Sequence, residues 1–166
     1  DRTQYVYSVG AAQYSGVVGY FLNEDGTKDY QTINQFKTGL ETEAEYDSDD
    51  NLVESESYSF RTFYFFDSLI KFTPGREITV NAVGVNLVGG ANTQLVSRDG
   101  LEKIFTVDLY EYDCDTYKLM LQNLTLSGGM DIINGTVLLE SVLVTGLDTA
   151  GITVSGQDTQ LLALNT

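Results

Sequence analysis

The chain has 166 residues, a net charge of −15 and a pI near 4.1, and it contains no His, no Trp and one Cys. The excess of acid over base argues against binding to a nucleic-acid backbone or an anionic membrane surface. Without His, and with Cys114 as the one thiol, the sequence excludes His-activated nucleophiles, an internal disulfide and thiolate metal clusters. The composition therefore predicts a protein that is not an enzyme.

Length and hydrophobic content predict one globular domain over residues 1–166, because 42% of the residues are hydrophobic and no apolar run reaches membrane-spanning length. The sequence starts at Asp1, without Met and without a charged-then-apolar leader. This start predicts a mature chain whose signal peptide has been removed, and therefore an extracellular or cell-surface location.

The N-terminal region predicts two strands, at residues 3–9 and 14–22, followed by a turn at 23–27 that contains Asp25-Gly26. Residues 5–21 are rich in apolar and small side chains, although chain termini normally fray unless they are tied down. We therefore expect a paired strand here. Two partners remain open, which are the chain's own sheet and the open sheet edge of a neighbouring subunit.

Residues 28–40 allow two interpretations. Tyr30, Ile33, Phe36 and Leu40 have helical spacing behind Asp29, a residue suited to an N-cap, so a short helix near 29–38 is one interpretation. A strand over the same residues is the other.

Residues 41–60 predict an acidic hairpin with a tip at 48–51, because every second residue from Glu41 to Asp49 is an acid. One register places Glu45 opposite Val53 and mixes acidic and apolar side chains on both faces. The other places Glu45 opposite Glu54, which gathers the acids on one face and the apolar side chains on the other. The second register is favoured, since the face that must be buried sets the register.

The hairpin tip, Asp47-Ser-Asp-Asp-Asn51, matches the opening of a calcium loop. It is not an EF-hand, because Leu52 and Tyr58 stand where that loop needs Gly and a bidentate Glu. Carboxylates at a hairpin tip can still hold Ca²⁺ through oxygen ligands, and a solvated acidic edge is the alternative. The candidate metal ligands are Asp47, Asp49, Asn51, Glu43, Glu45, Glu54 and Glu56.

The rest of the chain alternates apolar and polar residues between turn signals, which predicts strands at 61–72, 77–87, 94–97, 101–112, 117–126, 135–145 and 152–164. Strands at this spacing predict a single all-β antiparallel domain, a sandwich or jelly roll, with at most one short helix. The C-terminal third has the composition of a β-helix, but its glycines keep no fixed period, so no repeat is predicted. Asn123 and Asn134 begin N-glycosylation sequons.

These observations predict a non-enzymatic extracellular structural or adhesive subunit that associates with itself into a surface filament or coat. A second hypothesis is a Ca²⁺-dependent carbohydrate-binding module that uses exposed tyrosines. A third is a β-barrel that carries a small ligand, which requires a pocket.

Overall fold

The computed structural model describes residues 16–41, 47–51, 60–67, 69–72, 77–81, 84–97, 103–109, 118–145, 151–156 and 159–166. The described residues form twelve strands, joined in one hydrogen-bonded network, and one short helix. This confirms the predicted all-β class with at most one short helix. The helix is α1 (Ile33–Glu41), and the strands are β1 (Val17–Leu22), β2 (Lys28–Thr32), β3 (Arg61–Phe65), β4 (Leu69–Phe72), β5 (Ile78–Val80), β6 (Val85–Val88), β7 (Gln94–Ser97), β8 (Lys103–Asp108), β9 (Lys118–Ser127), β10 (Gly129–Thr145), β11 (Ile152–Val154) and β12 (Thr159–Leu164).

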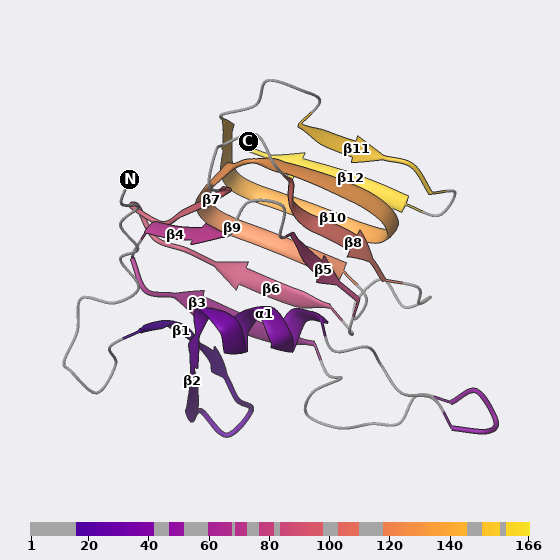
Figure 1. Cartoon of the computed structure of the whole chain (residues 1–166), viewed down its shortest axis with the longest axis horizontal. Helices are drawn as coiled ribbons and strands as arrows, with labels where there is room; N and C mark the ends of the chain where they lie inside the picture. Colours follow the sequence, from indigo (N-terminus) through magenta and orange to yellow (C-terminus); the bar gives the residue numbers. More distant parts are fainter. Residues whose placement is uncertain are drawn as a thin grey trace.

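Parallel pairing arranges the strands from β3 onward as three walls, each built from strands of successive turns of the chain (Figure 1). The first wall contains β3, β6, the start of β9, the middle of β10, and β12. The second wall contains β4, β7 and the ends of β9 and β10. The third wall contains β5, β8, the start of β10, and β11. Successive turns that stack in this way form a parallel β-helix.

The predicted antiparallel pairing is therefore wrong for most of the described strands, and the predicted sandwich or jelly roll is not confirmed. Only β1 makes antiparallel pairs, with β2 and with β3, among the described strands. The error has a physical cause, because inward and outward side chains alternate in parallel and antiparallel strands alike. Asn134-Gly135, which predicts a hairpin turn, lies inside β10, where Gly135 has a φ of 102° and the chain passes from the third wall to the first.

One corner of the β-helix repeats the same backbone conformation on successive turns. Gln122 pairs with Glu140, and Glu140 pairs with Leu164, so the residues that follow them lie in register. Those following residues all have a left-handed φ, which is 56° at Asn123 and Ser141 and 54° at Asn165. Asn adopts this conformation more readily than most residues. The corner between the first and second walls is thus made by single residues.

The interior consists of apolar side chains stacked in register from turn to turn. Phe63 pairs with Leu87, Leu87 with Leu121, and Leu121 with Leu139, and all four are at most 1% exposed. The third wall contributes a similar stack, in which Val80, Val107 and Ile132 follow one another. This core follows from the alternation seen in the sequence, since every second residue of each strand faces inward.

Helix α1 begins after a capping box. The backbone N–H of Gln35 donates to Thr32 Oγ1 at 3.3 Å, and the backbone N–H of Thr32 donates to Gln35 Oε1 at 2.9 Å. Asp29, the predicted N-cap, instead lies in β2, where it pairs with Phe21. Residues 28–40 therefore contain a strand followed by a helix, and each of the two interpretations holds for part of the segment.

The helix covers the N-terminal end of the interior. Phe36 is fully buried, with its ring centroid 4.7 Å from that of Phe63 and 5.2 Å from that of Phe65. The backbone N–H of Asn81, directly after β5, donates to the carbonyl of Leu40 at 3.3 Å. Figure 1 shows α1 lying across the lower end of the stacked strands. The first turn of the β-helix is thus capped, as repeat folds require.

The predicted N-terminal strand at 14–22 is present as β1, which pairs with β2 and β3 of its own chain. Its described part therefore has intramolecular partners on both sides. The predicted strand at 3–9 lies outside the described residues, so strand exchange between subunits stays a prediction for that segment. The turn at 23–27 is confirmed, since the N–H of Gly26 donates to the carbonyl of Asn23 at 2.9 Å, although only Gly26 of the Asp25-Gly26 pair has a positive φ.

Candidate functional site

The structure describes three of the seven candidate metal ligands, Asp47, Asp49 and Asn51, and places them in an exposed turn. The carboxylate of Asp47 accepts the backbone N–H groups of Asp49 at 2.9 Å and Asn51 at 3.0 Å. One oxygen of this carboxylate is therefore already used to hold the turn. Glu43, Glu45, Glu54 and Glu56 lie outside the described residues, as does the register of the acidic hairpin.

Within the described ranges, no group of three or more His, Cys, Asp or Glu side chains lies close enough to hold a metal ion. The described tip offers Asp47 and Asp49, with Asn51 beside them. A Ca²⁺ site in this hairpin stays a prediction, because the four glutamates that would complete it are not described.

We expect millimolar Ca²⁺ to raise the melting temperature above that in NaCl of matched ionic strength if the hairpin holds the ion. The gain should follow RT ln(1 + [L]/Kd) as calcium is varied. Screening alone would act equally in both salts, because it depends on ionic strength. Thermal unfolding checks this, with Asp47→Asn and Glu45→Gln expected to remove the difference. Equal melting temperatures in the two salts would leave a solvated acidic edge.

The outer side of the third wall carries a polar ladder that links successive turns. Thr106 donates its hydroxyl hydrogen to Glu77, Lys103 forms an ion pair with Asp131, and Thr153 donates to Asp131. Burial acts to raise the pKa of Asp131, but the hydrogen bonds from Lys103 and Thr153, with the Lys103 charge, outweigh it and lower the pKa below its ordinary value. The bond to Asp131 raises the pKa of Lys103. The polar side chains named here therefore bond to one another across successive turns of the third wall.

We expect the Asp131 ladder to stabilise the fold above about pH 4 and to lose its effect as the pH falls further. A carboxyl whose folded pKa is depressed gives stability that is present above the unfolded pKa, near 3.9, and is lost as the pH falls through the folded value. Asp131→Asn should therefore lower the melting temperature at pH 6 and hardly change it at about pH 2. The change in melting temperature should be small, since the side chains of Lys103 and Asp131 are 48% and 26% exposed.

Thermal unfolding from pH 2 to 6 checks this expectation, with the exposed Asp49→Asn as the matched control. A difference between Asp131→Asn and the original chain that stays constant down to the lowest pH would contradict it.

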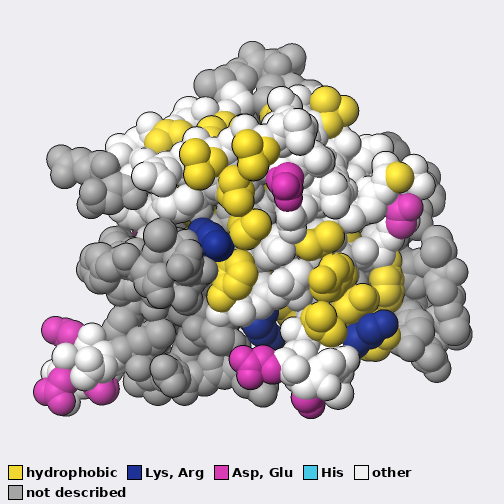
Figure 2. Space-filling view, turned by 180° about the vertical axis from the view of Figure 1, so that it is seen from behind, with side chains coloured by type: hydrophobic (Ala, Val, Ile, Leu, Met, Phe, Trp, Pro, Cys, Tyr) yellow, Lys and Arg dark blue, Asp and Glu magenta, His cyan; other side chains and the backbone are white. Residues whose placement is uncertain are grey.

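The outer side of the first wall carries more large apolar side chains than the third wall, although polar side chains, among them Asn86, Gln122 and Glu140, lie between them. Seen from behind in Figure 2, hydrophobic side chains gather at the lower right, where β1 and β2 lie, and continue upward toward the end at which β11 and β12 lie. Leu162 and Leu164 in β12 are 52% and 53% exposed. We call the apolar part of this surface the apolar face, and its side chains are Tyr20, Tyr30, Tyr64, Phe66, Val88, Met120, Leu138, Leu162 and Leu164.

At its N-terminal end the apolar face ends in an aromatic cluster. The ring of Tyr20 stacks on that of Tyr64 with centroids 5.5 Å apart, and it meets Tyr30 edge-on at 5.6 Å. Phe66 lies 6.4 Å from Tyr20 and 6.1 Å from Tyr30. The Nζ of Lys28 is 4.8 Å from the centroid of Tyr20, which is cation–π distance. These half-buried rings form a partly exposed aromatic platform.

The apolar face carries little charge, and both signs are present. Lys28 lies over Tyr20, and Lys118, at the start of β9, lies over Phe60 with its Nζ 5.5 Å from the ring centroid. Glu140 is the acid among the described outward side chains of the first wall, and its carboxylate accepts a hydrogen bond from Gln122. The face is therefore close to neutral in a chain whose net charge is −15.

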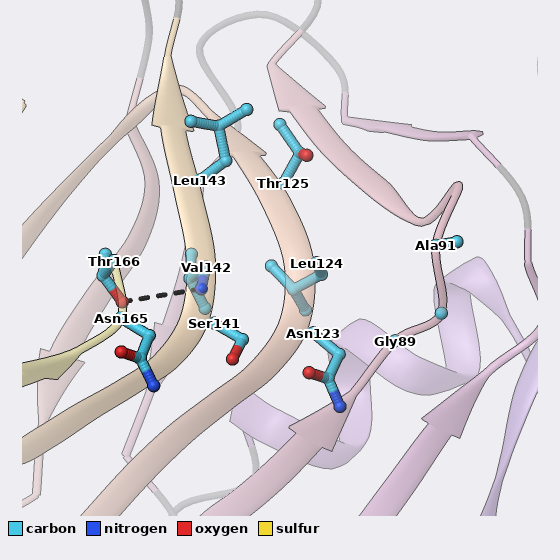
Figure 3. Close-up of a pocket in the computed structure, with 11 residues that line it drawn as sticks. Gly89, Ala91, Asn123, Leu124, Thr125, Ser141, Val142, Leu143, Asn165 and Thr166 are labelled. Atoms are coloured by element: carbon cyan, nitrogen blue, oxygen red, sulfur yellow. Dashed lines mark hydrogen bonds between the residues drawn. The ribbon is translucent and has the colours of Figure 1, made fainter.

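A groove of about 640 Å³ lies beside this face, along the corner between the first and second walls. Figure 3 shows the side chains of Asn123, Ser141 and Asn165 side by side at the groove, with Leu143 above them. The backbone N–H of Val142 donates to Thr166 Oγ1 at 3.5 Å. The groove thus combines exposed amide and hydroxyl groups with an apolar side chain, and its described lining has no charge.

The two glycosylation sequons lie in different surroundings. Asn123 is exposed at the corner, whereas Asn134 is half-buried and donates its amide to Asp108 at 2.7 Å. Of the two side chains, only that of Asn123 is presented freely to solvent.

No protein-family model, curated protein or solved structure matches this chain. Among the described helical residues, none forms a helix that is long and apolar enough to cross a membrane.

Sequence reasoning missed the apolar face, although one signal for it was present. Val137, Leu138 and Leu139 are consecutive apolar residues, so one of them must point away from the interior. Continuous apolar runs are typical of strands covered on both faces.

Proposed function

We propose that this chain is a non-enzymatic structural or adhesive subunit that acts outside the cell and associates with copies of itself. The apolar face is the observation that carries the proposal. Acidic composition keeps such a subunit soluble before assembly, because net charge opposes non-specific association.

The contrast between two walls of one molecule supports an interface. On the third wall, outward positions carry Thr, Asp and Lys side chains that bond to each other and meet water. On the first wall, one outward row carries Met120, Leu138 and Leu162 in register, and it continues as Asn86 on the side of β6. Solvent alone gives no reason for this difference, and contiguous exposed apolar patches mark interaction surfaces.

The size of the face suits a reversible association. Seven neighbouring strands, at spacings of about 4.8 Å and with about five residues of 3.3 Å each, cover roughly 500 Å². Two copies packed face to face would bury about 1,000 Å², the lower limit for a specific interface. Packing of one sheet on another needs such flat, side-chain-covered surfaces about 10 Å apart.

Charge favours a second copy as the partner. Two chains of net charge −15 repel one another over most of their surfaces. On the apolar face the repulsion is weak, because Lys28 and Lys118 offset Glu140. Two copies can therefore approach through this face at little electrostatic cost.

Sedimentation velocity over a hundredfold range of protein concentration tests the proposal. We expect the mean mass of the original chain to rise with concentration, and Met120→Glu to weaken the association at least tenfold, because it places a carboxylate in the apolar contact. Gln94→Glu is the matched control, since it adds the same charge at an exposed position of β7 in the second wall. A monomer at all concentrations, or equal behaviour of the two variants, would contradict self-association through this face.

A second candidate function is glycan binding, which the aromatic cluster and the groove favour. Tyrosine rings offer an apolar surface with a polar tip, and the uncharged amides of Asn123 and Asn165 suit a neutral, hydroxyl-rich ligand. A glycan array with and without chelator tests this candidate, and Tyr64→Ala is expected to abolish any binding. The described interior is filled by side chains, so this structure offers less support for a small-ligand barrel.

A further inference from the structure

The outward side chains between β2 and β10 form rows that cross the strands in register. Each row crosses the neighbouring strands β2, β1, β3, β6, β9 and β10 in that order. The first row contains Lys28, Leu22, Thr62, Asn86, Met120 and Leu138. The second row contains Tyr30, Tyr20, Tyr64, Val88, Gln122 and Glu140.

The charges of these two rows lie at opposite ends. Lys28 begins the first row on β2, and Glu140 ends the second row on β10. Five strand spacings of about 4.8 Å separate them by about 24 Å, so they cannot pair within one copy. Two further sets of charges lie beside the rows: Lys118 at the start of β9, and the exposed acids Glu24 and Asp25 in the turn after β1.

We propose that two copies pack their apolar faces together about a two-fold axis that runs along the strands and passes between β3 and β6. The inference rests on the self-association proposed above and specifies its geometry. This axis reverses the order of the strands, so β10 of one copy lies over β2 of the other, β9 over β1, and β6 over β3. The strands of the two sheets stay aligned, which is a common way for sheets to pack.

The reversed order places side chains of similar character opposite each other. In the first row, Leu22 of one copy lies over Met120 of the other, and both are apolar. Next to the axis, Thr62 lies over Asn86 of the other copy, so a hydroxyl group faces an amide. Apolar groups are thus buried against apolar groups, and the polar groups near the axis have partners that can donate and accept hydrogen bonds.

The reversed order also matches opposite charges. Lys28 of one copy lies over the strand that carries Glu140 in the other, one row away. The two rows are about 7 Å apart, which a lysine side chain can reach. Lys118 lies over the turn that holds Glu24 of the other copy, because β9 lies over β1. The two-fold axis repeats each of these contacts.

The same residues disfavour the alternative two-fold axis, which runs across the strands. That axis places each strand over the same strand of the other copy, so Lys28 comes near Lys28 and Glu140 near Glu140. With the axis between the two rows, Met120 lies over Gln122 and Leu138 over Glu140. Like charges then repel, and apolar side chains cover polar ones.

The two-fold axis also limits the size of the assembly. An isologous contact uses the same surface of both copies, so it closes after two copies. Association through the apolar face should therefore stop at a dimer.

Charge reversal tests this geometry by sedimentation equilibrium. Lys28→Glu and Glu140→Lys are each expected to raise the Kd of the dimer about tenfold, because each replaces two attractive contacts with repulsive ones. The double variant keeps the net charge and restores both pairs with exchanged signs, so its Kd should return to within about threefold of the original. Only a contact between copies can give this recovery, since the two residues are about 24 Å apart in one copy.

Two control variants separate this contact from the effect of net charge. Lys71→Glu in β4 of the second wall and Asp49→Lys in the exposed turn change the charge by the same amounts away from the apolar face. Glu140→Lys is the sharper of the test variants, because it lowers the net negative charge and is nevertheless expected to weaken the dimer. Circular dichroism and thermal unfolding verify that each variant is folded.

Cross-linking between two different chains tests the order of the strands directly. Leu22→Cys and Met120→Cys, each combined with Cys114→Ser, are prepared separately and mixed. A bifunctional thiol reagent that spans about 10 Å, the distance between packed sheets, should join one chain of each kind. Either chain alone should give little product, because its two thiols are offset by three strand spacings, about 14 Å. Product from either chain alone, and none specific to the mixture, would contradict the reversed order.

The outcomes separate this inference from the proposed function. If Met120→Glu weakens the association while Lys28→Glu and Glu140→Lys behave as their controls do, the apolar face stands and the reversed geometry is wrong. An association that continues beyond two copies and is weakened by Met120→Glu likewise overturns the two-fold axis alone. A chain that stays monomeric at all concentrations overturns both proposals.

Discussion

Phe63→Ala is expected to lower the free energy of unfolding by about 3–5 kcal/mol, the range for removing a fully buried Phe. The Phe63 ring, on β3 of the first wall, is fully buried beneath α1, and its centroid is 4.9 Å from that of Phe21, 4.7 Å from that of Phe36 and 5.0 Å from that of Phe65. Its loss would open a cavity beneath α1, where the cap meets the first turn. Urea unfolding followed by circular dichroism gives the value.

The size of the loss should depend on burial. Leu143→Ala, at a residue that is 60% exposed, is the control and should cost less than about 1 kcal/mol. Equal losses for the two variants would show that the stacked interior does not stabilise the fold in the way that its burial indicates.

Gly19→Ala is expected to destabilise the fold by about 3 kcal/mol, because an added methyl group has no space in β1. A Cβ there would lie 2.1 Å from the carbonyl oxygen of Tyr64 and 2.8 Å from Cε2 of Phe63. The backbone of β3 would have to move, which would disturb the pairing of the two strands. Replacing this glycine therefore tests the antiparallel contact that joins the N-terminal strands to the β-helix.

Gly39→Ala is the matched control, since the same change is made in helix α1. Its nearest contacts would be ring carbons of Phe21 at 3.6 and 3.8 Å, which is ordinary van der Waals separation. We expect it to stabilise the protein by about 0.5–1 kcal/mol, the difference in helix propensity between Gly and Ala. Thermal and urea unfolding of both variants check the pair, and destabilisation by Gly39→Ala or none by Gly19→Ala would contradict the packing.

The local parts of the fold could be predicted because local rules decide them. Leu119 and Leu121 face inward and Met120 outward, as alternation in a strand requires. The helical spacing of Ile33, Phe36 and Leu40 likewise predicts α1. Its boundary was available as well, since Thr32 and Gln35 have the spacing of a capping box.

The parallel arrangement could not be predicted, because it depends on which distant segments pair. Arg61 pairs with Val85, and Val85 with Leu119, at separations of 24 and 34 residues. Lys118 then pairs with Thr136 after only 18 residues. Because the turns differ in length, the sequence shows no repeat of fixed period. In addition, the Gly-containing dipeptides at the corners have the composition of hairpin turns.

The candidate site shows the same division between local and distant effects. The acidic run at 41–56 is a local pattern, and the calcium prediction was based on it. In the structure, the carboxylate of Asp47 accepts hydrogen bonds from the backbone of its own turn. The apolar face is assembled from Tyr20, Tyr64, Met120 and Leu138, which come from four different strands. No window of the sequence contains that surface, and only the register between strands creates it.

The unequal lengths of the turns also have a kinetic consequence. Strand β9 leads into β10 with a single residue between them, and their pairing closes a segment about half as long as that between β6 and β9. Because closure entropy grows with segment length, by about 0.6 kcal/mol per doubling, β9 and β10 should pair first among the parallel strands, and the turns on either side should then form on them. In a chevron analysis, Leu139→Ala should then slow refolding, whereas Phe63→Ala should mainly speed unfolding. Folding would start inside the chain and reach the capped end late.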